Sequence, residues 1–136
     1  MTIRALLRTV DGQAVFRHHA NVLLVTTARV RERVVDVLTR YAPAPAHCLR
    51  HWPVEPPTDG SIIIPAVEDL LPDDQLSMLS WYDHSPRLPQ VFAVSAIPLF
   101  QRVLRGTFVE DLYYRLNTVY LRLDSALTGA VRFDAV

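Results

Sequence analysis

Continuous apolar runs of strand length, separated by helical patterns, constrain the fold of this chain more than any other feature. The runs are Asn21–Thr26 (NVLLVT), Ser61–Ile64 (SIII) and Gln90–Ala96 (QVFAVSA). They are typical of strands that are buried on both faces, as in a parallel sheet. Parallel neighbours need crossover connections, which usually contain a helix. The pattern therefore predicts an α/β fold with a mainly parallel sheet.

Helical patterns lie between these runs. Residues 28–41 carry apolar side chains at helical spacing and are followed by Pro43, which stops a helix. A second helix is expected to open at Asp73, where a carboxylate favours the positive end of the helix dipole. Its inner stripe is expected to consist of Leu76, Leu79 and Tyr82. The other expected elements are helices over 2–17 and 98–105 and strands over 47–51 and 118–123. Together these elements predict a three-layer sandwich around a sheet of about five strands.

The stretch Gly106–Leu123 (GTFVEDLYYRLNTVYLRL) is predicted to form a short helix that runs into the last strand. Thr107 and Glu110 have the spacing of a capping box, in which each side chain satisfies a free backbone N–H of the first turn. An apolar stripe recurs every four residues at Phe108, Leu112 and Leu116. Arg115 lies off that stripe, so packing does not obviously require it.

The composition excludes several classes of function. The chain has 136 residues, which fits one domain, and its 14 basic and 14 acidic residues balance. No basic excess points to nucleic acid, and no apolar run approaches the roughly 18 residues of a membrane-spanning helix. All the basic residues are arginine, which excludes lysine-based chemistry. A single cysteine, Cys48, fits a reducing cytoplasm.

The stretch Gly106–Leu123 also resembles a segment of the AAA+ domain of bacterial sigma-54-dependent transcription activators. The usual form of that segment, after the sensor I strand, is G-x-F-R-E-D-L-Y-Y-R-L-N. In that family the two arginines reach the nucleotide of a neighbouring subunit. Here the first position is Val109, and the second is retained as Arg115.

The resemblance extends over about residues 20–123, within a single domain spanning 1–136. It implies an AAA+-like core of the P-loop NTPase type, with a five-stranded sheet in the order 5-1-4-3-2. The helical lid, the loop that contacts sigma-54 and the DNA-binding helix-turn-helix of the family have no counterpart in this sequence. Direct DNA binding is therefore not expected.

The phosphate-binding loop of the family is altered at each key position. On an ungapped alignment of residues 21–35, the glycines become Thr26, Arg29 and Arg31, and the lysine becomes Glu32. A phosphate loop needs glycines so that backbone N–H groups can close on the phosphates, and it needs a lysine to neutralise them. We interpret these four residues as degenerate phosphate-loop positions.

The Walker B motif is altered as well. The family's Asp-Glu pair, which would hold Mg²⁺ and position the attacking water, becomes Pro65 and Ala66. The polar pair of sensor I becomes Ser95 and Ala96. The combined losses predict that the chain has no catalytic residue, does not hydrolyse ATP, and uses neither ATP nor Mg²⁺ as a cofactor.

The sequence thus favours a non-hydrolysing AAA+-like regulatory module of bacterial transcription or signalling, located in the cytoplasm. Such a module would act by protein–protein contact, through the surfaces that AAA+ subunits use to associate. Its partner would be itself, an active sigma-54 activator or another signalling protein. The alternative hypothesis is an ATP-binding domain with a rebuilt phosphate pocket that uses Arg29, Arg31 or Arg115.

Two alternatives remain open for each candidate cation. Arg115 either acts as an arginine finger on a partner's nucleotide or pairs with Asp111, which lies four residues earlier. Arg29 and Arg31 either bind an anion near a helix N-terminus or belong to a solvated helix face.

Three other groups favour structural readings. His47, Cys48 and His51 suggest a metal site, but a strand would place Cys48 on the opposite face from the two histidines, so no metal is expected. The cluster Glu68, Asp69, Asp73 and Asp74 fits a solvated loop and helix start better than a partner surface. Trp52, Trp81 and Tyr82 fit core or loop packing better than interface anchors.

Overall fold

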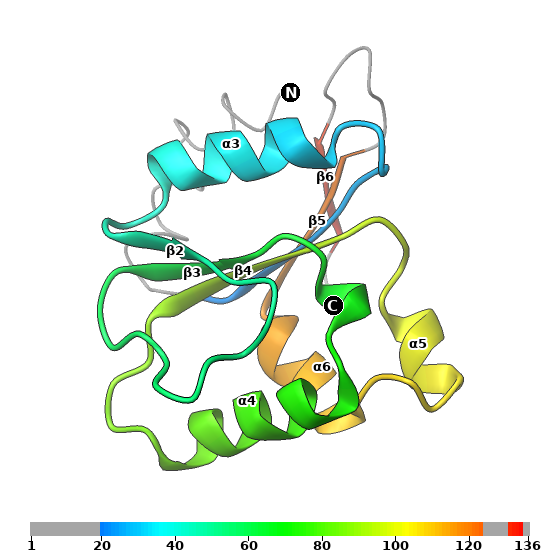
Figure 1. The fold of residues 1–136 in the computed structure, drawn as a ribbon. Coiled ribbons are helices and arrows are strands. Elements are labelled where there is room, and N and C mark those ends of the chain that lie inside the picture. The colour runs from blue at the N-terminus through cyan, green and yellow to red at the C-terminus, as the bar shows by residue number, and fades with distance from the viewer. Residues whose placement is uncertain (1–19, 124–130, 135–136) are drawn as a thin grey trace.

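The computed structural model describes residues 20–123 and the backbone of 131–134 (Figure 1). The helix predicted over residues 2–17 lies outside the described residues. No helix in the described ranges is long and apolar enough to cross a membrane.

A single sheet forms the centre of the described structure. Its strands run in the order β2-β3-β4-β1-β5-β6. The strands are β1 (Val22–Val25), β2 (Ala46–Cys48), β3 (Ser61–Ile64), β4 (Gln90–Ser95), β5 (Val119–Leu123) and β6 (Val131–Asp134). The first five strands in sequence pair in parallel, which confirms the order 5-1-4-3-2. The sequence did not predict β6, which pairs antiparallel with β5 at the edge.

Helices cover both faces of the sheet, which gives the expected three-layer sandwich (Figure 1). The helices are α3 (Arg31–Tyr41), the 3-10 helix η1 (Val67–Asp69), α4 (Pro72–His84), α5 (Phe100–Leu104) and α6 (Glu110–Leu116). Helix α3 packs on one face, and α4 and α6 pack on the other.

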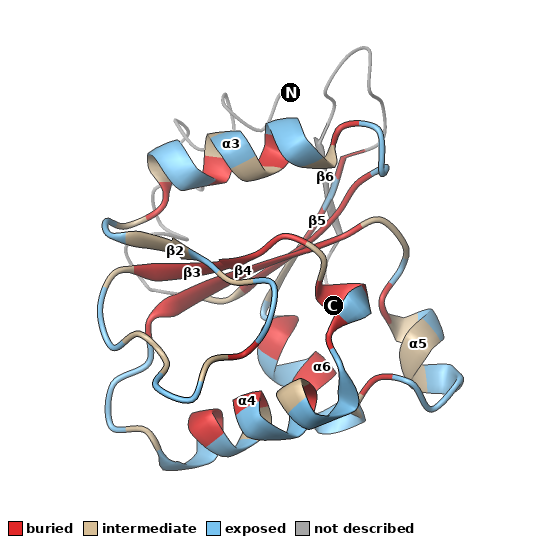
Figure 2. Cartoon of the chain, in the orientation of Figure 1, coloured by how far each residue is buried: buried red, intermediate tan, exposed pale blue. Residues whose placement is uncertain are grey.

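The central strands β1, β3 and β4 are buried at every position because both of their faces are covered (Figure 2). Leu23 and Ile62 point toward the core under α4 and α6. Val22, Leu24 and Ile63 point toward α3. Successive side chains of a strand alternate between the two faces. Apolar side chains are therefore favoured on both faces of these strands, which explains the continuous apolar runs that predicted them.

The connections after β1 and β4 leave in opposite directions. The chain passes from β1 through α3 to β2, and from β4 through α5 and α6 to β5, on the other face. Open α/β sheets bind ligands in the crevice outside the carboxyl ends of their strands, at such a switch point. A ligand-binding site is therefore expected at the edge where β1, β3 and β4 end.

The buried face of α4 differs from the predicted stripe. Its buried residues are Gln75, Met78, Trp81 and Tyr82, whereas Leu76 is 57% exposed. Trp81 packs against the buried Trp52, with ring centroids 4.9 Å apart. This aromatic pair sets the rotation of the helix and turns Leu76 toward solvent. The core role expected for Trp52, Trp81 and Tyr82 is confirmed.

The predicted capping box is also wrong. Helix α6 begins at Glu110 with Val109 as its N-cap residue, and no side chain caps it. The Thr107 hydroxyl instead donates to the carbonyl of Arg102, at 3.2 Å. The N–H of Val109 donates to Oε1 of Gln75, at 2.8 Å. A buried amide from α4 therefore satisfies the backbone that the local motif was expected to satisfy.

Two more boundaries shift. Helix α3 begins at Arg31 rather than at residue 28, and β2 ends at Cys48, so His51 is not part of a strand. The apolar stripe of α6 is confirmed, because Phe108, Leu112 and Leu116 are all buried.

The phase of α4 can be tested by a pair of substitutions. Met78→Ala should lower the free energy of unfolding by about 2–5 kcal/mol, because Met78 is fully buried and its truncation leaves a cavity. Leu76→Ala should change it by no more than about 0.5 kcal/mol, because Leu76 is exposed. Urea denaturation followed by circular dichroism measures both. The reverse ranking would contradict this orientation of α4.

Candidate functional site

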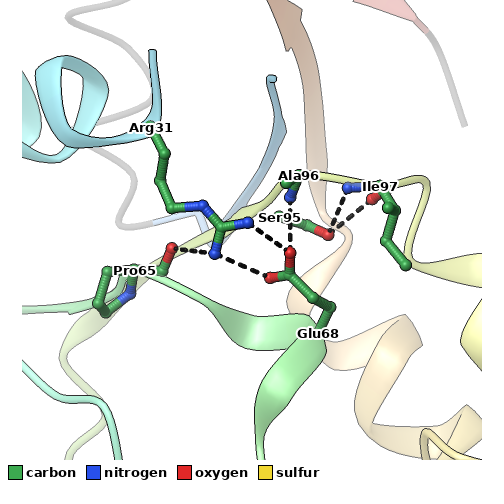
Figure 3. A network of polar contacts seen from close by, with 6 residues as sticks. All are labelled: Arg31, Pro65, Glu68, Ser95, Ala96 and Ile97. Carbon is green, nitrogen blue, oxygen red and sulfur yellow. Dashed lines mark hydrogen bonds and ion pairs between the residues drawn. The ribbon is translucent and has the colours of Figure 1, made fainter. Parts of the chain in front are cut away.

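Polar groups from four segments meet at the carboxyl edge of the sheet (Figure 3). Arg31 begins α3, just after the loop that leaves β1. Pro65 directly follows β3, and Glu68 lies in η1. Ser95 ends β4, and Ala96 follows it. These parallel strands end at the same edge, so segments that are distant in sequence become neighbours.

Arg31 and Glu68 form the central ion pair of this cluster. Nη2 of Arg31 lies 2.6 Å from Oε2 of Glu68, and Nη1 donates to Oε1 at 3.4 Å. Nη1 also donates to the carbonyl oxygen of Pro65, at 3.3 Å. The side chains are 19% and 5% exposed, respectively. A two-pronged contact of this kind fixes the orientation of both groups.

Glu68 also holds the loop after β4. Its Oε2 accepts the backbone N–H of Ala96, at 2.9 Å. In the same loop, the Ser95 hydroxyl donates to the carbonyl of Ile97, at 2.6 Å. The carboxylate therefore ties η1 to the start of α3 and to the end of β4, and it links three of the loops that form this edge.

The structure brings some of the predicted site residues together and separates others. Arg31 and Pro65 are in contact through the carbonyl of Pro65. Thr26 is buried at the end of β1, where its N–H donates to the carbonyl of Ser95 at 2.9 Å. Arg29 and Glu32 are exposed, and Ala66 is half-buried between β3 and η1.

Sequence reasoning missed Glu68, because it was grouped with three other carboxylates of an acidic cluster. The signal that could have found it is positional. Glu68 follows a buried strand by four residues, and Arg31 starts the helix after another buried strand. The two strands end at the same edge of one sheet. Oppositely charged side chains just beyond the ends of two such strands can lie close enough to form an ion pair.

The cluster has a defined chemical capacity. The Arg31 guanidinium is neutralised by Glu68 and is mostly shielded from water. An anion that approached Arg31 would have to displace a carboxylate that is already bound at two oxygens. The arrangement is therefore suited to holding loops together rather than to binding a phosphate.

A pocket of about 180 Å³ lies beside this cluster, at the carboxyl ends of β1, β4 and β5. Thr26 and Arg122 are among the residues that line it. The Thr26 hydroxyl is buried, and it has no hydrogen-bond partner among the described residues. The pocket therefore contains a hydroxyl group that a small polar group could contact.

Arg115 lies on the far side of the sheet from α3 and pairs with a residue of α4. Its Nη2 lies 2.5 Å from Oδ1 of Asp83, and both side chains are nearly half exposed. Its guanidinium carbon lies 5.9 Å from the ring centre of Tyr82. The expected helical partner Asp111 is therefore wrong, because the ion pair links two helices instead.

Tyr82 of α4 is buried and lies beside Arg115. Burial raises the pKa of the Tyr82 hydroxyl far above its usual range, and the positive charge of Arg115 opposes this shift. The hydroxyl therefore stays protonated across the physiological range. Arg115 and Tyr82 act here as neighbours that join α6 to α4.

His47 and His51 do not converge on a common site. Nε2 of His47 lies 3.3 Å from Asp59, and Nδ1 of His51 lies 3.6 Å from Asp74. Within residues 20–123, the structure places no group of three histidine, cysteine, aspartate or glutamate side chains where they could hold a metal ion.

Comparison with known proteins gives matches among solved structures only. No protein-family model matches the chain, and no curated protein does. The crystal structure of NtrX from Brucella abortus in complex with ATP matches with a TM-score of 0.64 and 14% identity, over 92% of this chain and 36% of that one. The complex of NtrX with ADP gives 0.62 and 17% identity, over 82% and 34%. A further NtrX structure gives 0.59 and 15% identity, over 84% and 36%.

These matches establish the fold. The chain has the same α/β sandwich fold as the matching part of NtrX. It spans about a third of the length of each NtrX chain.

The role of the Arg31–Glu68 pair can be tested by comparing a substitution of Glu68 with a substitution of Asp69, its neighbour in η1. Glu68→Ala should lower the free energy of unfolding by about 1–3 kcal/mol, because it leaves the shielded Arg31 guanidinium without its counter-ion and the Ala96 N–H without its acceptor. Asp69→Asn, at the exposed neighbouring position, should change it by less than about 0.5 kcal/mol. Equal losses in thermal denaturation would contradict the role given to Glu68.

The Arg115–Asp83 pair can be tested with double-mutant cycles. Arg115→Met and Asp83→Asn should show a coupling energy of about 0.2–1 kcal/mol, since the pair is half exposed. The coupling should fall as salt is added. The matched cycle of Arg115→Met with Asp111→Asn should show a coupling near zero. A larger coupling to Asp111 than to Asp83 would contradict the observed pairing.

Proposed function

We propose that this chain is a non-hydrolysing AAA+-like regulatory module of bacterial transcription or signalling that acts by protein–protein contact. The single observation that carries the proposal is the Arg31–Glu68 ion pair. It lies at the switch point of the sheet, among the residues that align with the phosphate loop and Walker B motif of sigma-54-dependent activators. The fold shared with NtrX supports the same assignment.

The chemistry of this edge argues against a nucleotide. ATP bound there would need a cation for its phosphates and carboxylates for Mg²⁺. The closest cation, Arg31, is neutralised by Glu68. The positions that would hold Mg²⁺ are Pro65 and Ala66, which offer no side-chain ligand. Glu32, the counterpart of the phosphate-loop lysine, is exposed and negatively charged.

Contact with another protein would use residues that remain exposed on the folded chain. Leu71, Leu104 and Tyr114 are large apolar residues with more than half of their surface exposed. Tyr114 is next to Arg115, which resembles the second arginine finger of the family. To reach a partner's nucleotide, Arg115 would exchange Asp83 for a phosphate, and its exposure permits that exchange.

One observation favours the alternative of a rebuilt phosphate pocket. The buried Thr26 hydroxyl lacks a partner among the described residues, and it lines the same pocket as Arg122. A phosphate group could accept a hydrogen bond from that hydroxyl. In this reading the chain would still bind ATP, with Arg29 near the phosphates.

Calorimetric titration with ATP, with and without Mg²⁺, separates the two functions. We expect no saturable heat, and no thermal stabilisation of the protein at about 1 mM ATP. A ligand present at 100 times its Kd would stabilise the fold by about 2.7 kcal/mol, so binding would be visible. Thr26→Val is the matched control. Micromolar binding that Thr26→Val weakens would overturn the lead proposal in favour of the rebuilt pocket.

A further inference from the structure

A groove of about 530 Å³ opens between the start of α4 and the connection from α5 to α6. Glu68 is among the residues that line the groove, but Arg31 is not. Its apolar lining consists of Leu70, Leu71, Pro72, Phe108 and Val109. Leu71 remains 56% exposed, although it lies against this hollow. The groove thus presents apolar surface that nothing in the described chain covers.

Buried hydrogen bonds hold the two walls of the groove in place. Nε2 of Gln75 donates to the carbonyls of Leu70 and Thr107, at 2.9 and 3.1 Å. Its Oε1 accepts the N–H of Val109 from the opposite wall, at 2.8 Å. Gln75 itself is only 1% exposed. The groove is therefore preformed, and an occupant would not have to order it.

Arg102 gives the groove a specific chemical preference. It lines the groove, and its Nε–H is shielded from solvent without an acceptor among the described residues. Of the two lining carboxylates, Glu68 is bound to Arg31 and Asp69 is exposed. A shielded donor without an acceptor costs free energy that an incoming acceptor would recover. The groove suits an aliphatic side chain beside a carboxylate.

This chain presents such a segment on its own surface. The loop Pro53–Pro57 (PVEPP) carries Val54, which is 100% exposed, and next to it the exposed Glu55. Three of its five residues are proline, which restricts the φ angles of the loop, and the backbone bends at Val54 and Glu55. A fully exposed valine beside a carboxylate matches the apolar walls and the cation of the groove.

Both ends of this loop are anchored. Trp52 is buried against Trp81 at the start of the loop. At its end, Gly60 has a φ of +69°, and a Cβ atom there would lie 1.9 Å from the carbonyl oxygen of Pro45. Only glycine fits so close an approach at that φ. The buried Trp52 before the loop and the constrained Gly60 three residues after it therefore limit the positions that the loop can take.

We propose that the groove receives the Pro53–Pro57 loop of a second copy of this chain. Val54 would enter between Leu71 and Phe108, and the Glu55 carboxylate would accept from Arg102. This names the partner in the protein contact proposed above, and it rests on that proposal. Because loop and groove are different surfaces, each copy gives one contact and receives another. Such heterologous contacts close into rings or extend head to tail.

Sedimentation equilibrium over about 1–500 µM protein tests the proposal, because this range detects association with a micromolar Kd. The mean mass of the wild-type chain should rise with concentration. Val54→Asp in the loop and Arg102→Glu in the groove should each weaken association at least about tenfold. Leu71→Asp replaces Arg102→Glu if circular dichroism shows that the latter misfolds. Leu88→Asp, an exposed leucine beyond the other end of α4, is the matched control and should associate like wild type.

Mixing the two variants gives the sharpest result. Val54→Asp keeps an intact groove, and Arg102→Glu keeps an intact loop, so the mixture should form a 1:1 complex and nothing larger. A wild-type chain that stays monomeric overturns the loop–groove contact, and so does association that both variants retain. A mixture that forms no complex overturns it as well. Those outcomes leave the non-hydrolysing function standing, since the ATP titration decides that function separately.

Discussion

The ion pair between Arg31 and Glu68 organises the edge of the sheet where a site would be expected. One carboxylate binds the first residue of α3 and the N–H of Ala96, and the Arg31 guanidinium also reaches the carbonyl of Pro65. The loops after β1, β3 and β4 are therefore closed on one another by the chain itself. We propose that this closure takes the place of the contacts that a bound phosphate and metal would otherwise provide at this edge. We regard that substitution as the central feature of this protein.

A second buried polar residue plays a similar part on the opposite face. Gln75 joins the start of α4 to the segment before α6 with hydrogen bonds to Leu70, Thr107 and Val109. Polar side chains buried in a low-dielectric interior are favourable only when their hydrogen bonds are made. Glu68 and Gln75 each satisfy several backbone groups at once. Glu68 thereby holds the edge of the sheet closed, and Gln75 holds the walls of the groove apart at a fixed geometry.

The sequence predicted the fold better than it predicted the site. Strands such as Ser61–Ile64 were recognisable because burial on both faces demands apolar residues at every position. The strand order 5-1-4-3-2 came from the family resemblance and is confirmed. The contacts of Glu68 with Arg31 and Ala96, of Gln75 with Val109, and of Arg115 with Asp83 could not be predicted, because the partners lie 28 or more residues apart in sequence. Local patterns suggested a solvated position for Glu68, a capping box and an i,i−4 pair, and tertiary packing replaced all three.

The most direct measurement is a crystal structure determined from crystals grown with ATP and Mg²⁺ in excess. We expect the Arg31 guanidinium to remain on Glu68, and no phosphate density between the ends of β1, β3 and β4. A triphosphate bound at that edge, with Arg31 turned away from Glu68 toward the phosphates, would contradict the central claim. It would show that the ion pair is a resting contact in a working nucleotide site.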